Sequence, residues 1–291
     1  MADRLTYKFC KAILSCAVLS ALSISFVAGR ASADDALEKI KEKGIIKSGV
    51  ANEAPWMIIN PDGNLSGVGP DIDKEALAAT GVTNYQAQAM DYGAMIPALQ
   101  VRRIDIISSG ALFIKPKRCE QVIYSDPVLC NSAGFMLTKG LEGKIQSYED
   151  VARANLRIGI APGGYEARYA AKAGIPQENI VPIPDGVSAV KMLQDKRIDL
   201  IALPDASLET LRDQVKDPNL VVFFPVKNTP MGCAGAAFNK EDVALRDLYN
   251  EGLKKIVANG KYAEMMTKYG LASRIPLREG QTTAALCASE E

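Results

Sequence analysis

Short apolar runs alternate with amphipathic stretches along most of the chain. Runs such as Ile45–Val50 are apolar enough for buried strands, and the stretches between them place apolar residues three or four positions apart, as helices do. Because helical connections allow successive strands to run in parallel, the pattern predicts an α/β fold with mostly parallel pairing. The elements predicted first are the strands Ile45–Val50, Tyr85–Met90 and Ile104–Ser108, the helices Ala36–Lys43 and Ala94–Arg102, a helix opened by Pro70, and a hairpin turn at Asn60–Asn64 between Trp56–Ile59 and Leu65–Val68.

The same rhythm begins again after about residue 132. The segment Gln100–Asp105 resembles Gln194–Asp199, and each ends a predicted helix and enters a buried strand. The restart and this correspondence favour two similar α/β lobes, and residues 275–291 lose the periodicity and are interpreted as a tail. The elements predicted here are the strands Ala133–Thr138, Leu156–Ile160, Ile180–Ile183, Leu200–Ala202, Leu220–Pro225 and Ala234–Phe238, and the helices Tyr148–Arg153, a helix from Gly163 to Lys172, Ser188–Lys196, Ser207–Gln214, Asp242–Ala258 and Lys261–Tyr269.

The first 33 residues are typical of a secretory signal peptide. A basic start is followed by an apolar stretch over residues 12–28, and Ala31-Ser32-Ala33 forms the small-x-small pattern of a cleavage site. A membrane anchor is the alternative, but the apolar stretch is short and interrupted by serines. Cys16 lies inside the stretch, which argues against a lipoprotein. We therefore expect export to the periplasm and cleavage after about Ala33.

Composition narrows the function of residues 34–291. They carry 30 basic and 33 acidic side chains, so we expect neither nucleic acid nor an anionic membrane as a partner. The chain has no histidine, which excludes Ser-His-Asp and Cys-His chemistry and histidine-based metal sites, and it has no P-loop pattern. We expect no metal, no cofactor and a monomer.

Four cysteines follow the signal segment, namely Cys119, Cys130, Cys233 and Cys287. Their spacing matches no zinc pattern, and in an oxidising compartment they can form one or two disulfides. All three full pairings stay open from the sequence. Cys287 lies in the predicted tail and is the cysteine most easily left unpaired.

Several segments, in this order and spacing, resemble the bacterial extracellular solute-binding proteins of family 3, over about residues 36–272. The resemblance implies a two-lobed periplasmic binding protein of type II that closes on a ligand by a hinge and delivers it to the permease of an ABC importer. Lobe 1 would comprise residues 34–131 and 233–274, lobe 2 residues 132–232, with crossings near 128–136 and 228–236. The carrying segments are Ala36–Ile40, Leu65–Ile72, Ile96–Leu99, Gly110–Arg118, Val122–Pro127, Arg197–Asp199 and Ala236–Lys240.

Within that family the chain is similar to the ectoine and hydroxyectoine receptors. The shared features are Glu53, an aromatic residue three positions on, an aromatic residue before Gly93 and a phenylalanine five positions before an arginine. This resemblance implies that the Arg118 guanidinium binds the ligand carboxylate and Glu53 the ligand cation, between the aromatic faces of Trp56, Tyr92 and Phe113. Trp56 and Tyr92 replace other aromatic residues that are usual there.

The second lobe offers a less specific signal. Gly163, Gly164 and Tyr165 lie between a predicted strand and a helix, where free backbone N–H groups can bind an oxygen and Tyr165 can cover the ligand. Amino-acid receptors of the family hold the α-ammonium with an aspartate at a position that is Pro204 here, and Asp205 falls one residue later. This shift disfavours ordinary α-amino acids and leaves the role of Asp205 open.

Each of these residues also has a simpler interpretation. Arg118 could form a surface ion pair, Glu53 could be a solvated loop charge, Trp56 could belong to the core, and the glycine turn could be a plain connection between a strand and a helix. A receptor for a polar amino acid or a betaine is the alternative ligand class. A dehydratase-like enzyme on the same fold would need Glu53 or Glu166 as a general acid or base.

Overall fold

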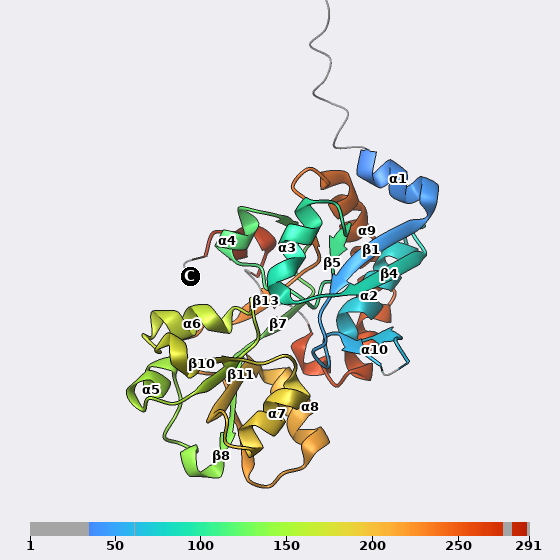
Figure 1. Cartoon of the computed structure of the whole chain (residues 1–291). Coiled ribbons are helices and arrows are strands. Elements are labelled where there is room, and N and C mark those ends of the chain that lie inside the picture. The colour runs from blue at the N-terminus through green and yellow to red at the C-terminus, as the bar shows by residue number, and fades with distance from the viewer. Residues whose placement is uncertain (1–34, 61, 276–280, 290–291) are drawn as a thin grey trace, which may run out of the picture.

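The computed structural model describes residues 35–60, 62–275 and 281–289, and these residues form two lobes around two five-stranded sheets (Figure 1). The predicted two-lobed α/β fold is therefore confirmed. The predicted signal peptide lies outside the described residues. Among the described helices, none is long and apolar enough to span a bilayer.

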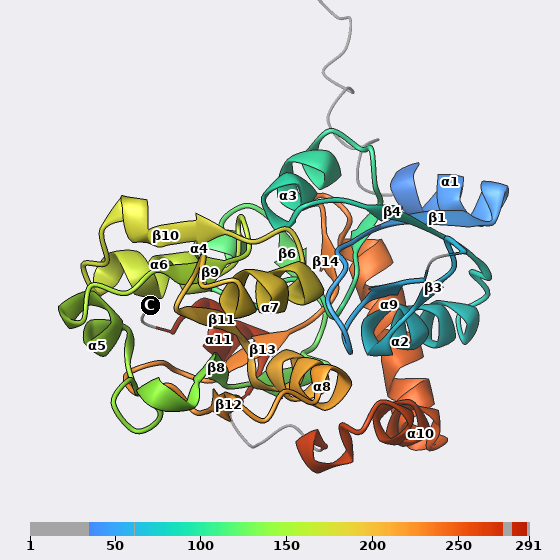
Figure 2. The same cartoon turned by 60° about the horizontal axis from the view of Figure 1, so that its bottom comes forward.

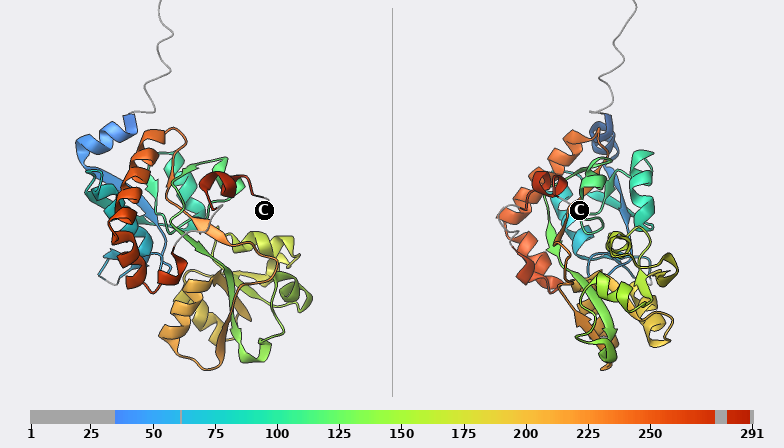
Figure 3. Two further views of the ribbon diagram at one scale, coloured as in Figure 1. Left: turned by 180° about the vertical axis from the view of Figure 1, so that it is seen from behind. Right: turned by 90° about the vertical axis from the view of Figure 1, so that its left-hand side faces the viewer.

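The sheet of the first lobe has the strand order β4-β1-β5-β14-β6. Its parallel part pairs β1 (Ile45–Val50) with β4 (Asn84–Ala89) and β5 (Ile106–Ile107), whereas β14 (Ala237–Phe238) runs antiparallel to β5 and to β6 (Ile123–Tyr124). The late strand β14 thus completes a sheet begun by the N-terminal half, so this lobe is discontinuous in sequence. The helices of this lobe are α1 (Asp35–Lys43), α2 (Val68–Ala78), α3 (Tyr92–Gln100), α4 (Pro116–Cys119), α9 (Val243–Ala258) and α10 (Lys261–Lys268), and Figure 3 shows α9 and α10 on its rear.

The sheet of the second lobe has the order β10-β9-β11-β8-β12. Parallel pairing joins β9 (Ile158–Ile160) to β10 (Ile180–Pro182) and β11 (Leu200–Pro204), and β8 (Ala133–Thr138) runs antiparallel to β11 and β12 (Leu220–Phe223). Figure 2 shows α7 (Gly186–Gln194) and α8 (Asp205–Val215) in front of this sheet. The other helices of the lobe are α5 (Tyr148–Arg153) and α6 (Glu166–Lys172).

The two resembling sequence segments form the same structure in both lobes. Arg102 and Lys196, at equivalent positions, have φ angles of 60° and 58°, in the left-handed region where a helix ends. Further on, Asp105 accepts from the Lys47 N–H at 2.8 Å, and Asp199 accepts from the Arg157 N–H at 2.8 Å. In each lobe this aspartate fastens the incoming strand to its neighbour. The sequence correspondence therefore reflects one structural unit used twice.

Two short strands connect the lobes. β7 (Leu129–Asn131) pairs antiparallel with β13 (Gly232–Ala234), and both lie within the predicted crossing segments. Cys130 and Cys233 face each other in this ribbon and form a disulfide. The predicted single strand Ala234–Phe238 is in fact divided between the hinge ribbon and β14, because the chain leaves one sheet and enters another within these residues.

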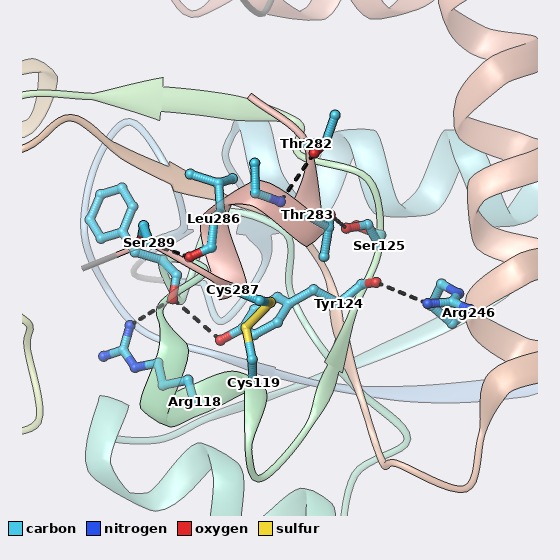
Figure 4. Close-up of a disulfide and its surroundings, with 12 residues drawn as sticks. Arg118, Cys119, Tyr124, Ser125, Arg246, Thr282, Thr283, Leu286, Cys287 and Ser289 are labelled. Carbon is cyan, nitrogen blue, oxygen red and sulfur yellow. Dashed lines mark hydrogen bonds between the residues drawn. A yellow bond between two sulfur atoms is a disulfide. The ribbon is translucent and has the colours of Figure 1, made fainter. Parts of the chain in front are cut away.

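Part of the segment interpreted as a C-terminal tail forms a short helix. Residues 283–287 form helix α11 (Thr283–Cys287), and Cys287, which we expected could stay unpaired, forms a disulfide with Cys119 at the end of α4 (Figure 4). The Thr283 hydroxyl also donates to the Ser125 carbonyl at 2.6 Å. Helix α11 is thus held against the first lobe by a covalent bond and a hydrogen bond.

Candidate functional site

A cavity between the lobes collects most of the predicted binding residues. Both lobes and the hinge ribbon contribute to its wall, so its shape depends on how closely the lobes approach one another. Its lining residues are Glu53, Trp56, Tyr92, Gly110, Ala111, Phe113, Arg118, Leu129, Asn131, Ala161, Gly164, Tyr165, Glu166, Leu203, Pro204 and Ala234.

Glu53 is held by a hydrogen-bond network that crosses between the lobes. It follows β1 in a tight loop closed by backbone bonds with Met57 of 2.8 and 2.9 Å. The Glu53 carboxylate accepts from the Tyr92 hydroxyl at 2.6 Å and from the Ser207 hydroxyl of the second lobe, also at 2.6 Å. Ser207 in turn accepts from the Trp56 indole N–H at 2.8 Å. The first-lobe residues Glu53, Trp56 and Tyr92 are therefore joined to helix α8 through one hydroxyl.

Burial raises the pKa of Glu53 above its ordinary value, and the hydrogen bonds from Ser207 and Tyr92 lower it in part. A carboxylate that already accepts two hydrogen bonds and is poorly solvated gains from a cationic neighbour. The site therefore offers Glu53 as an anionic partner for a ligand cation.

Arg118 forms a second connection between the lobes. It lies in the short helix α4, whose first residue is Pro116, and its guanidinium donates to the Phe113 carbonyl at 3.1 Å and to the Gly163 carbonyl of the second lobe at 3.2 Å. These bonds occupy Nη1 and Nη2 once each, and a guanidinium has five N–H donors. Donors of Arg118 thus stay available for a ligand carboxylate.

Aromatic rings complete the cavity. Phe113 and Tyr165 come from different lobes and meet edge to face, with ring centroids 4.6 Å apart. Tyr165 is 7 % exposed and Trp56 is 2 % exposed, so both rings are nearly sealed from solvent. An aromatic, water-poor wall favours a flat or delocalised cation over a strongly hydrated ammonium.

The Gly163–Gly164 turn brings the two backbones into contact. Gly163 has a φ of +78°, and a Cβ atom there would lie 2.4 Å from the Gly93 nitrogen at the start of α3. Only glycine permits both this conformation and this approach. The Gly164 N–H, which we expected to be free for a ligand, instead donates to the Ala161 carbonyl at 2.9 Å.

Gly163 and Asp205 are the two predicted site residues that do not line the cavity, and Asp205 is engaged elsewhere. Its carboxylate pairs with Arg274 at 3.0 Å and accepts from the Ser132 N–H at 3.2 Å, and the Asp205 side chain is 4 % exposed. Because Pro204 ends β11 and already lines the cavity, the next residue starts α8 and points elsewhere. Asp205 therefore fastens α8 to the hinge and lies outside the cavity wall.

Ser207 and Glu166 were not among the residues predicted to bind the ligand, although Glu166 was a candidate acid or base. Ser207 links Glu53 to Trp56, and Glu166, at 3 % exposure, lines the cavity. Burial raises the pKa of Glu166 to about 8, the charge of Glu53 contributes in the same direction, and Arg118 opposes it. The adjacent glycine turn was a signal for Glu166, whereas nothing in the local sequence marks Ser207. In the described part of the chain no cluster of His, Cys, Asp or Glu is arranged to hold a metal ion.

A two-lobed fold with a polar, aromatic-lined cavity at the lobe interface defines a solute receptor. The chain belongs to the bacterial extracellular solute-binding proteins of family 3, whose model matches residues 46–272. It is thus a substrate-binding component of an ABC transporter for a small polar solute, in an extracellular or periplasmic receptor family that is not enzymatic.

Individual relatives refine this picture. The crystal structure of EhuB in complex with hydroxyectoine is 40 % identical, covers 87 % of this chain and 98 % of EhuB, and superposes with a TM-score of 0.80. A probable amino-acid ABC transporter periplasmic-binding protein, y4tE of Sinorhizobium fredii, is 31 % identical over 94 % of this chain and 92 % of its own. The arginine-binding extracellular protein ArtP of Bacillus subtilis is 25 % identical over 87 % of this chain and 96 % of its own.

Proposed function

We propose that this receptor binds a small zwitterion with a carboxylate and a delocalised ring cation, of which ectoine and hydroxyectoine are the examples. The observation that carries the proposal is the placement of Glu53 and Arg118 in one cavity with the rings of Trp56, Tyr92 and Phe113. Ectoine is a cyclic amidinium carboxylate, so Glu53 would bind its ring N–H groups and Arg118 its carboxylate. The similarity to EhuB, solved with hydroxyectoine, supports the same class of ligand.

The mechanism of capture follows from the contacts between the lobes. A ligand held by Glu53 and Arg118 of the first lobe is covered by Tyr165 and the Gly163–Gly164 turn of the second. Because these contacts form only when the lobes approach, ligand binding favours the closed form, which the membrane permease would recognise. Residues 1–33 would direct export to the periplasm before they are cleaved.

A receptor for a polar amino acid is the second candidate, because ArtP of Bacillus subtilis is an arginine-binding protein by name and y4tE a probable amino-acid receptor. Two features disfavour it. Pro204 stands where such receptors carry the ammonium-binding aspartate, and the neighbouring Asp205 is engaged by Arg274. The aromatic walls also offer few hydrogen-bond acceptors to an α-ammonium group.

Isothermal titration calorimetry with a ligand panel tests the assignment. We expect ectoine or hydroxyectoine to bind more tightly than glycine betaine, proline, arginine or glutamine. Binding of arginine or glutamine without binding of either cyclic amidine or of a betaine would refute the proposed ligand class. Recovery of the ligand unchanged after long incubation is expected of a receptor.

A further inference from the structure

The acidic side chains of the cavity outnumber the basic ones by one. Among its lining residues are two carboxyl groups, Glu53 and Glu166, and one guanidinium, Arg118. A zwitterionic ligand adds one charge of each sign. If both carboxyl groups were ionised, the occupied cavity would keep one uncompensated negative charge away from water, which is costly.

Glu166 and Arg118 both meet the glycine turn of the second lobe. It is the first residue of α6, directly after the turn whose Gly163 carbonyl accepts from Arg118. Its Oε2 atom lies against the same turn, 2.6 Å from where a Cβ on Gly164 would be. Glu53, in contrast, is held by Tyr92 and Ser207. A ligand carboxylate that pairs with Arg118 would therefore lie beside Glu166.

Building on the ligand class proposed above, we infer that Glu166 is a specificity-determining residue that meets the ligand as a neutral carboxylic acid and donates a hydrogen bond to its carboxylate beside Arg118. A protonated carboxyl group has one O–H donor for this purpose. Arg118 and Glu53 then match the two charges of the zwitterion one to one. An ionised Glu166 would instead repel the ligand carboxylate at short range in a poorly screened cavity.

The groups around Glu166 support this protonation state. Burial raises its pKa to about 8, and the negative charge of Glu53 adds to the effect while Arg118 opposes it. Three tyrosines, Tyr92, Tyr148 and Tyr165, also feel its charge, and burial raises the pKa of each well above the ordinary value. These tyrosines stay neutral below about pH 10, so Glu166 is the group in this set that titrates near pH 8.

The test is the dissociation constant of ectoine and hydroxyectoine between about pH 6 and pH 9.5, a range in which a carboxylate and an amidinium keep their charges. For the wild-type protein we expect the constant to be flat up to about pH 8 and then to rise by a factor approaching tenfold per pH unit. At about pH 9, titrations in two buffers of different ionisation enthalpy should show uptake of up to one proton on binding.

Glu166→Gln removes the titration but keeps the size and an N–H donor. We expect it to weaken binding three- to tenfold at about pH 6.5 and to abolish both the rise in the dissociation constant above pH 8 and the proton uptake. The control is Glu178→Gln, an exposed residue of the same lobe, which should retain the wild-type pH profile.

The outcomes separate this inference from the ligand assignment. Absence of ectoine and hydroxyectoine binding at every pH would contradict the proposed function. Binding that is independent of pH in the wild-type protein would contradict the role of Glu166 alone. Arginine binding that strengthens as the pH rises would also overturn it, because it would show an ionised Glu166 serving as a partner for a cation.

Discussion

Arg118 combines a structural and a binding role within one side chain. Its guanidinium joins Phe113 of its own lobe to Gly163 of the other, and Arg118 also lines the cavity. We expect Arg118→Ala to weaken ectoine binding at least tenfold, about 1.4 kcal/mol, because the ligand carboxylate loses a bidentate partner. Lys117→Ala is the matched control, since it removes the same charge from the exposed neighbouring position of α4.

Replacing Trp56 should weaken ectoine binding by a similar factor, for a different reason. Trp56→Ala removes one aromatic face of the cavity and the donor to Ser207, so we expect at least tenfold weaker binding. Calorimetry on both variants, after circular dichroism has shown native folding, provides the measurement. Wild-type ectoine affinity in both Arg118→Ala and Trp56→Ala would contradict the proposed binding roles of these residues.

Glu166 also affects stability without any ligand. Its pKa is raised from 4.5 to about 8 in the folded protein, so between these values the folded state binds more protons than the unfolded state. The stability contributed by protonated Glu166 is therefore fully present below about pH 4.5 and is lost as the pH rises through about 8. Each pH unit in this window costs at most roughly 1.4 kcal/mol.

Glu166→Gln should make unfolding less dependent on pH. Urea unfolding at about pH 5, 6.5 and 8 should show the free energy of unfolding of the variant rising relative to wild type at each step. Burial also raises the pKa values of Glu53 and Asp73, but both residues are present in the wild-type protein and in the variant, so the comparison reports on Glu166. A constant difference between the two proteins at the three pH values would argue against a buried, protonated Glu166.

The sequence indicated most of the first-lobe side of the cavity and, in the second lobe, Gly164 and Tyr165. Glu53, Tyr92 and Arg118 follow strands or begin helices at spacings that are visible locally, and the structure places all three at the cavity. Ser207 was not predicted, because its importance comes from the docking of α8 against Trp56 and Glu53, which lie about 150 residues earlier in the chain. The sequence also could not show that Asp205 pairs with Arg274, because that contact depends on how η3 (Ala272–Arg274) packs near the hinge.

The local pattern of apolar and polar residues likewise predicted the presence of helices, strands and turns better than the residues at which they begin and end. The hairpin at Asn60–Asn64 is present, with the Asn60 N–H donating to the Asn64 carbonyl at 2.9 Å. In contrast, the run from Ala234 to Phe238 is divided between two sheets, which no local periodicity reveals. The pairing of Cys119 with Cys287 spans 168 residues and becomes evident only when α11 is seen against α4.

Helix α11 and its disulfide act on the element that carries Arg118. Cys287 is bonded to Cys119, the residue after Arg118, and Thr283 is bonded to Ser125, so the C-terminal segment restrains both ends of the 119–125 region. Restraining α4 in this way holds the guanidinium ready for its ligand and reduces the ordering needed on binding. Figure 4 shows this proximity of the disulfide to Arg118.

Replacing the disulfide tests this coupling. We expect the double variant Cys119→Ser/Cys287→Ser to lose about 2–4 kcal/mol of stability, which lowers the melting temperature by roughly 4–16 °C. Well below that temperature it should still bind ectoine less tightly than wild type. Introduced into Arg118→Ala, the same change should cost no further affinity, whereas an equal cost in both backgrounds would mean that the disulfide does not act through Arg118.

At the scale of the whole molecule, function depends on how closely the two lobes can approach. The contacts that join them at the cavity include Ser207 with Glu53 and Trp56, Arg118 with Gly163, Phe113 with Tyr165, and the backbone of Gly163 against Gly93. The hinge ribbon of β7 and β13 allows the lobes to separate without breaking either sheet. Closure can therefore be disturbed without altering any group that binds the ligand chemically.

Gly163→Ala would obstruct closure of the lobes directly. Its Cβ would lie 2.4 Å from the Gly93 nitrogen, so the lobes could not meet as they do in the wild-type protein. Gly174→Ala is a matched control, because Gly174 has nearly the same φ, +76°, but open space around its Cβ position. Both variants strain the backbone, and only Gly163→Ala obstructs the interface.

We therefore expect Gly163→Ala to weaken ectoine binding at least tenfold and Gly174→Ala to leave it within about twofold, although both lower the melting temperature of the ligand-free protein. Small-angle X-ray scattering should show the radius of gyration of wild type and Gly174→Ala decreasing with saturating ectoine, while that of Gly163→Ala decreases less. Equal ectoine affinity and equal compaction in the two variants would show that this backbone contact does not limit closure. The side chains of the cavity alone would then determine how tightly the ligand is bound.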